Sequence, residues 1–281
     1  INSSLRPTVI DVIRYAKNNS LKLGFIRDIN EELSFYYQYA EGFRSPDFYS
    51  SNLSFTNFAF RYTIIPNPDL GPEESEGSEF GFKGQASNGS WSVAFYDNDY
   101  KDFIETEMTG FTMTGLMKFV YKNLDDVNIK GSEIKANFNL SDNLTAQFGF
   151  NNSKGRQDGK RLTTVDPDQA ILGLLWNSDD SKLSINTYAR ITDGSPKSLP
   201  PVCGRTPPCA DALTLPDHTL IDSFISYSIN KKFSMRLAIR NITDKKYWNW
   251  SDVAGSAAND SALDYFLNPG RNYSLSFRFV F

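Results

Sequence analysis

The chain has 281 residues, a net charge of −4 at neutral pH and a pI near 5.2. This charge balance excludes the basic stripe of a nucleic-acid-binding protein, so no nucleic acid is expected as a partner. No apolar run approaches the length of about 18 residues that a membrane-spanning helix needs. Barrel strands need only about nine to eleven residues of alternating polarity, and a mean hydropathy of −0.42 with 14% aromatic residues fits them.

The dominant pattern is the alternation of apolar and polar residues that half-buried strands require. In residues 33–40, Leu, Phe, Tyr and Tyr occupy the odd positions, and in residues 233–240 an apolar face lies opposite Arg236 and Arg240. A change of phase near Gly131 predicts a β-bulge. The pattern predicts eleven strands, at residues 20–28, 32–43, 74–86, 91–105, 127–140, 143–154, 168–178, 181–193, 217–229, 233–244 and 270–281.

Short turns and long connections alternate along the chain. Turn-forming pairs stand near residues 30–31, 88–89, 141–142, 179–180 and 230–231. Short turns at one end and long loops at the other are typical of outer-membrane barrels. The long connections run roughly over residues 44–73, 106–126, 155–167, 194–216 and 246–268.

We therefore expect an all-β fold, an antiparallel transmembrane β-barrel surrounded by lipid in the bacterial outer membrane. Single-chain bacterial barrels have an even number of strands, so eleven strands predict the C-terminal part of a larger barrel. Plugged outer-membrane transporters have twenty-two strands, twice the number predicted here. Residues 1–281 are expected to form one barrel unit, with residues 1–19 as an extracellular loop or an incomplete strand.

The last predicted strand places Tyr273, Leu275, Phe277 and Phe279 on one face and ends at Phe281. A terminal aromatic residue that closes an alternating strand resembles the assembly signal read by the outer-membrane insertion machinery. The alternative is the final strand of a soluble sheet.

Two boxes in the first half of the chain carry a family resemblance. The sequence FRSP at residues 43–46 and the sequence NPDL at residues 67–70 resemble the paired FRAP and NPNL boxes of TonB-dependent haem and haemoglobin receptors. The run NITDKKY at 241–247 is similar to a box near the end of many such receptors. Residues 207–216 and the pair Tyr247-Trp248 resemble the haemoglobin, transferrin and lactoferrin subgroup. The motif-loop residues matched in the paired boxes are Phe43, Pro46, Asn67 and Pro68.

The resemblance covers the chain from about residue 20 and implies uptake of haem iron from haem or a host haem protein, without catalysis. It also implies a plug domain absent from this chain and energy coupling to TonB. Haem is then a cargo, with no permanently bound cofactor. The alternatives are a siderophore or vitamin B12-type receptor of the same class, whose cargo would be a ferric siderophore or the vitamin, a soluble β-rich binding or adhesion domain, and a barrel enzyme.

Four residues are candidate ligand contacts. Arg44 could donate both arms of its guanidinium to a haem propionate, or position its loop by hydrogen bonds. Haem receptors of this family usually carry a histidine between the two boxes, but residues 47–66 contain none. Tyr49 and Tyr62 lie in this interval and tyrosine can ligate haem iron, although both could be ordinary loop aromatics. His218, the only histidine, could be a ligand or a solvated residue at the end of a strand.

Cys203 and Cys209 stand in a Pro-rich loop segment. A disulfide in an oxidising compartment is the favoured interpretation, because a zinc site would need further ligands and the chain has one histidine. No metal site is predicted. The chain has no nucleophile elbow and no dinucleotide-binding fingerprint, so the sequence does not favour an enzyme.

Overall fold

The computed structural model describes residues 18–280 except 125, 158, 163–164, 196–198, 200 and 203–208. Eleven strands follow one another in a single sheet, in the order of the chain, and every neighbouring pair is antiparallel. They confirm the eleven predicted strands. Their bounds are β1 (Lys22–Asp28), β2 (Leu33–Arg44), β5 (Glu73–Ala86), β6 (Gly89–Lys101), β9 (Val127–Ser141), β10 (Leu144–Gln157), β12 (Gln169–Asn177), β13 (Leu183–Thr192), β14 (His218–Asn230), β15 (Phe233–Arg240) and β16 (Asn272–Phe279).

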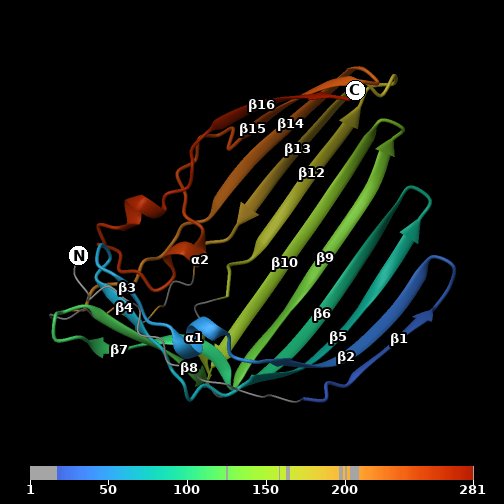
Figure 1. Cartoon of the computed structure of the whole chain (residues 1–281). Helices are drawn as coiled ribbons and strands as arrows, with labels where there is room; N and C mark the ends of the chain where they lie inside the picture. The colour runs from blue at the N-terminus through green and yellow to red at the C-terminus, as the bar shows by residue number, and fades with distance from the viewer. Residues whose placement is uncertain are drawn as a thin grey trace.

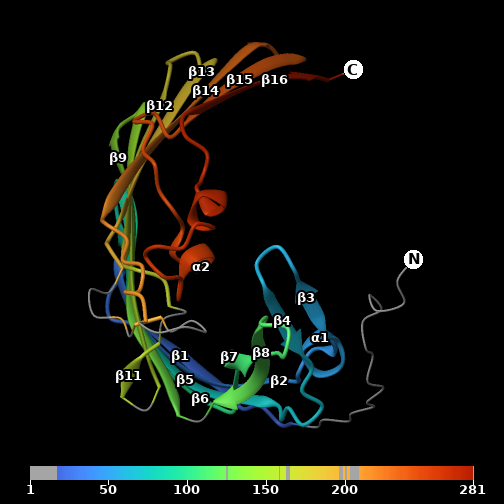
Figure 2. The same ribbon diagram turned by 90° about the vertical axis from the view of Figure 1, so that its left-hand side faces the viewer.

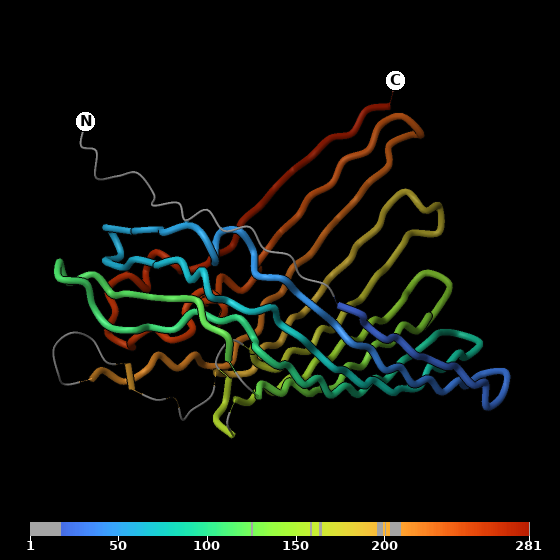
Figure 3. Tube along the Cα trace, turned by 60° about the horizontal axis from the view of Figure 1, so that its bottom comes forward, coloured from blue at the N-terminus to red at the C-terminus, as the bar shows by residue number. Residues whose placement is uncertain are grey.

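The sheet is a curved wall with a concave and a convex side (Figures 1 and 2). Its edges are β1 and β16, which do not pair with each other in the described part of the chain. Tight turns gather at one end and the long connections at the other (Figure 3). Asparagine side chains close the turns: Asn230 Oδ1 accepts from the backbone N–H groups of Lys232 at 2.9 Å and Phe233 at 3.0 Å.

The two faces of the wall differ in polarity, as the alternation predicts. Leu172, Leu174 and Phe277 remain about half exposed to solvent or more, at 48%, 53% and 58%. The opposite face carries polar contacts, such as Tyr36 Oη to Glu79 Oε1 at 2.8 Å. This polar face is concave, since it also carries the strand residues that meet the inward-folded loops. Among the described residues, no helix is long and apolar enough to cross a membrane.

The predicted bulge at Gly131 is wrong. Pairing of β9 with both β6 and β10 runs through Gly131 without a shift of register. The glycine is needed for another reason: a Cβ atom there would lie 2.5 Å from the hydroxyl of Tyr96. The side chain of Tyr96 therefore occupies the space above Gly131 on the neighbouring strand.

The strand predicted at 91–105 is also interrupted. Asp102 has a φ of 54°, a left-handed conformation that ends β6 at Lys101. The chain then continues as β7 (Phe103–Phe111) and β8 (Met117–Leu124). These strands do not join the main sheet but belong to a second, smaller one.

The second sheet is built from two connections that were predicted as long loops. The 44–73 connection contributes α1 (Phe48–Asn52), β3 (Phe55–Asn57) and β4 (Tyr62–Ile65). The strand order is β3-β4-β8-β7, and β4 pairs with β8 in parallel. We call these four strands the loop sheet. It lies on the concave side of the wall in Figure 2, at the end opposite the tight turns.

The last long connection also folds inward. It carries α2 (Trp250–Val253) and η2 (Leu263–Phe266), whereas β11 (Lys160–Arg161) extends an earlier hairpin. Trp250 and Val253 are buried and pack with Leu215 of the neighbouring connection. Asn241, with a φ of 51° and 3% exposure, begins the bend, and its N–H donates to Asp222 Oδ1 at 2.7 Å.

The polarity of the two faces gives the first prediction. In the complete receptor, Leu172→Arg is expected to lower the free energy of unfolding by about 2–4 kcal/mol, because it places a charge on the lipid face near the middle of β12. Gln147→Arg on β10 is the matched control. Gln147 pairs with Gly173 and lies on the polar face at the same depth, so this arginine meets water.

Denaturant unfolding in lipid vesicles measures both variants. Equal losses of stability in the two would contradict the assignment of the faces.

Candidate functional site

The FRSP box lies where β2 leaves the main sheet. Arg44 Nη2 donates to Glu73 Oε2 at 2.6 Å, and Glu73, whose side chain is 11% exposed, also accepts from the backbone N–H of Ile104 at 3.1 Å. One carboxylate thus joins β2, β5 and β7. Phe43, the residue before Arg44, pairs with Glu74 across the ladder. The observed partner of Arg44 is Glu73, and a ligand role for Arg44 stays a prediction.

The rest of the box begins α1. Pro46 precedes Asp47, the N-cap residue, whose Oδ1 accepts from the Ser50 N–H at 2.7 Å. This backbone hydrogen bond, helped by the charge of Arg44, lowers the pKa of Asp47. The cap keeps α1 folded directly above the rim of the wall.

The NPDL box meets the FRSP box through α1. The Asn67 N–H donates to the carbonyl oxygen of Ser50 at 3.1 Å, and Asn67 Nδ2 donates to the carbonyl oxygen of Tyr121 on β8 at 2.8 Å. Pro68 follows, and Leu70 is fully buried. The paired boxes therefore fix the loop sheet to the wall. We call this set the rim lock: Arg44, Ser50, Asn67, Leu70 and Glu73.

Tyr49 and Tyr62 lie on different parts of the loop region. Tyr49, on α1, is 70% exposed and contacts Phe48 edge-on, with ring centroids 6.2 Å apart. Tyr62, on β4, is half-buried between Phe55 and Phe119, at 6.0 and 6.1 Å. The two tyrosines have no mutual ring contact among the described pairs, and iron ligation by them stays a prediction.

Exposed aromatic side chains gather around Tyr62. Phe58, at the β3–β4 turn, is 64% exposed. Phe60 contacts two rings of η2, Tyr265 at 6.4 Å and Phe266 at 6.0 Å, and Tyr265 is 81% exposed. Two connections about 200 residues apart in sequence thus share one surface. We call it the aromatic patch: Phe55, Phe58, Phe60, Tyr62, Tyr265 and Phe266.

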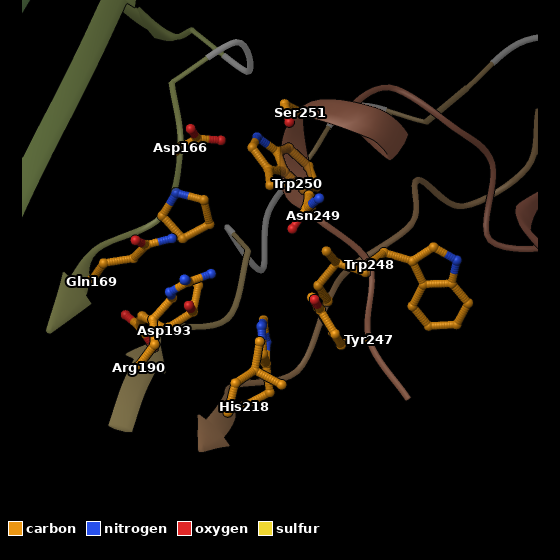
Figure 4. A pocket seen from close by; sticks show the side chains of 14 residues that line it. Asp166, Gln169, Arg190, Asp193, His218, Tyr247, Trp248, Asn249, Trp250 and Ser251 are labelled. Atoms are coloured by element: carbon orange, nitrogen blue, oxygen red, sulfur yellow. The ribbon is translucent and has the colours of Figure 1, made fainter. Parts of the chain in front are cut away.

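His218 lies elsewhere, in a recess on the concave side of the wall (Figure 4). Its ring stacks on Tyr247, with centroids 5.2 Å apart and planes inclined by 29°. Arg190 of β13 lines the same recess, which holds about 130 Å³. Burial raises the pKa of Tyr247, so its phenol stays protonated near neutrality. We call this feature the lumen recess; its other lining residues are Asp166, Pro167, Gln169, Thr192, Asp193, Leu215, Leu220, Trp248, Asn249, Trp250 and Ser251.

Cys209 is disulfide-bonded. Cys203 lies outside the described residues, so its pairing with Cys209 stays a prediction. The residues next to both cysteines, Val202 and Ala210, exchange backbone hydrogen bonds of 2.8 and 2.9 Å. Phe281, the predicted assembly signal, also lies outside the described residues. Within the described ranges, no group of three or more His, Cys, Asp or Glu side chains could hold a metal ion.

Sequence analysis did not identify Glu73, Phe58, Phe60, Tyr265 or Phe266 as functional residues. Four aromatic residues between 55 and 62 were a usable signal, because long loops seldom expose so many rings together. The contact of Phe60 with η2 left no local signal.

The rim lock gives a prediction about the loop sheet. Asn67→Ala removes two hydrogen bonds, to the Tyr121 carbonyl and from the Asp69 N–H. We expect amide hydrogen exchange in β4 and β8 to accelerate about tenfold. Asn57→Ala is the control, because it removes one hydrogen bond, from the Phe60 N–H, at the hairpin tip. Unchanged exchange in the Asn67 variant would show that the lock does not hold the sheet.

The chain spans about a third of the length of the curated proteins it is similar to. It is 25% identical to a probable haemoglobin and haemoglobin-haptoglobin-binding protein 4 of Haemophilus influenzae, over 94% of this chain and 30% of that protein. It is 23% identical to a haemoglobin-haptoglobin utilization protein B of Neisseria meningitidis serogroup C, over 90% of this chain and 36% of that protein.

A solved structure shares the fold. The copper transporter OprC superposes with a TM-score of 0.73 at 17% identity, over 93% of this chain and 39% of that one. The model of the TonB-dependent receptor-like β-barrel family matches residues 8–242, which is most of the sequence. This chain therefore belongs to the TonB-dependent receptor β-barrel family.

Proposed function

We propose that this chain forms part of the wall and the outer loops of a receptor that takes haem iron from a host haem protein. The observation that carries the proposal is the aromatic patch, exposed on a loop sheet that the rim lock holds at the non-turn end of the wall. Relatives along nearly the whole chain are named for haemoglobin binding, which supports a haem protein as the partner.

The patch has the composition of a protein-binding surface. Aromatic side chains supply most hot spots because they bury a large area with few rotatable bonds. The contact of Phe60 with Tyr265 and Phe266 presents rings from two loops together. A partner that docks here would touch the β3–β4 hairpin and η2 at the same time.

Transport through the wall would use parts of the receptor outside this chain. We propose that a plug domain fills the complete barrel and that TonB, acting on the plug, supplies the energy for passage. In this mechanism the polar concave face contacts water and plug, and the described side chains bind cargo without catalysing a reaction.

A ferric siderophore is the second candidate cargo, because residues 47–66 contain no histidine to meet haem iron. Growth on a single iron source separates the two. Cells that depend on this receptor should grow on haemoglobin and fail on ferric siderophores if the proposal holds.

The patch gives a prediction about affinity. In the complete receptor, Phe58→Ala and Tyr265→Ala are each expected to weaken haemoglobin binding about tenfold, because each removes an exposed ring from the docking surface. Ile29→Ala is the matched control: Ile29 is 55% exposed but lies at the tight-turn end. Biolayer interferometry on detergent-solubilised receptor measures all three. Binding that survives both patch changes unaltered would exclude the patch as the docking site.

A further inference from the structure

The lumen recess holds an imidazole in a form suited to binding a metal. The PKA contacts of His218 include a hydrogen bond to the backbone of Pro216, and since proline has no N–H the imidazole donates to its carbonyl oxygen. A neutral imidazole that donates from one ring nitrogen keeps a lone pair on the other. Metal-binding histidines are usually held in this way, by a backbone carbonyl or a carboxylate on the nitrogen that does not bind the metal.

Tyr247 holds the plane of that imidazole. The two rings stack at 5.2 Å, and Tyr247 comes from the 241–271 connection whereas His218 begins β14. Since burial keeps the Tyr247 phenol protonated, Tyr247 is a weaker ligand for ferric iron than the neutral His218 imidazole. Tyr247 is thus a positioning residue for His218.

A cation stands beside the pair. Arg190 lines the recess, and no described carboxylate forms an ion pair or hydrogen bond with its guanidinium. Figure 4 shows Arg190 and Tyr247 on either side of His218. Two carboxylates also line the recess, Asp166 and Asp193, and Asp193 accepts from the Gly194 N–H at 2.8 Å. The fork of Arg190 therefore remains available for an added carboxylate.

We propose that the lumen recess is a haem contact on the inward side of the loops, in which His218 binds the ferric iron and Arg190 binds a propionate. This inference rests on the proposed function, since it takes haem as the cargo. The recess, at about 130 Å³, is too small for a porphyrin, so the macrocycle lies in the open interior against its mouth. The iron accepts the lone pair of the neutral imidazole, and no proton or electron is transferred.

The test uses the complete receptor in detergent, titrated with ferric haemin and followed by its Soret band and by electron paramagnetic resonance. His218→Ala is expected to weaken haemin binding about tenfold and to change the spin-state signature, because it removes an axial ligand. Added imidazole should restore the wild-type spectrum. Thr219→Ala, on the other face of β14, is the matched control and should leave both unchanged.

Two ligand variants isolate the contacts. Metal-free protoporphyrin IX should bind the wild type and His218→Ala equally, since it forms no axial bond. Haemin dimethyl ester, which lacks the propionate charges, should bind the wild type more weakly than haemin does and should not distinguish Arg190→Gln from the wild type.

The outcomes separate this inference from the proposed function. Tight haemin binding with identical spectra in the wild type and His218→Ala would overturn the recess assignment and leave haem uptake standing. A wild-type receptor that binds no haemin would overturn both. Undiminished haemoglobin binding by His218→Ala verifies that the variant is folded.

Discussion

The backbone hydrogen bonds of the main sheet are the constraint on which the rest of the structure depends. A bilayer offers no partner for an N–H or a carbonyl group, so each membrane-crossing strand must be paired on both sides. The nine inner strands, from β2 to β15, satisfy this within the described chain. The chain is an outer-membrane β-barrel protein of the TonB-dependent receptor family, and its convex apolar face is the surface that lipid covers.

The same ladder decides where function can lie. Its residues alternate between lipid and lumen, so surfaces that bind a partner must come from the connections or from the upper part of the polar face. The rim lock makes one connection rigid by joining it to β5 and β8 through Glu73 and Asn67. Burial of Trp250 and Val253 holds another connection inward. Rigid loops lose little conformational entropy when a partner docks.

The sequence was sufficient to predict the wall, because a period of two is a local signal that each strand carries by itself. The loop sheet was not predictable in this way. The four residues of β4 are too few to show alternation, and the partner strand β8 lies about 50 residues away. Asp102 adopts a left-handed conformation where its neighbours continue the strand pattern, so the end of β6 was placed too late.

The candidate site was predicted in part. The two boxes indicated the right region, but their residues turned out to hold structure: Arg44 is bound to Glu73, and Asn67 to Ser50 and Tyr121. The exposed rings beside them form the surface instead. The stacking of His218 on Tyr247 joins residues from separate elements, which only the three-dimensional structure could reveal.

The central claim is that the loop sheet faces the cell exterior and the tight turns face the periplasm. Single cysteines at Phe58 and at Lys231, treated on intact cells with a membrane-impermeant maleimide, test it most directly. The native cysteines do not interfere if they are oxidised, as Cys209 is. The account predicts that Phe58→Cys is labelled and Lys231→Cys is labelled only after the outer membrane is opened. Labelling of Lys231→Cys alone on intact cells would contradict it.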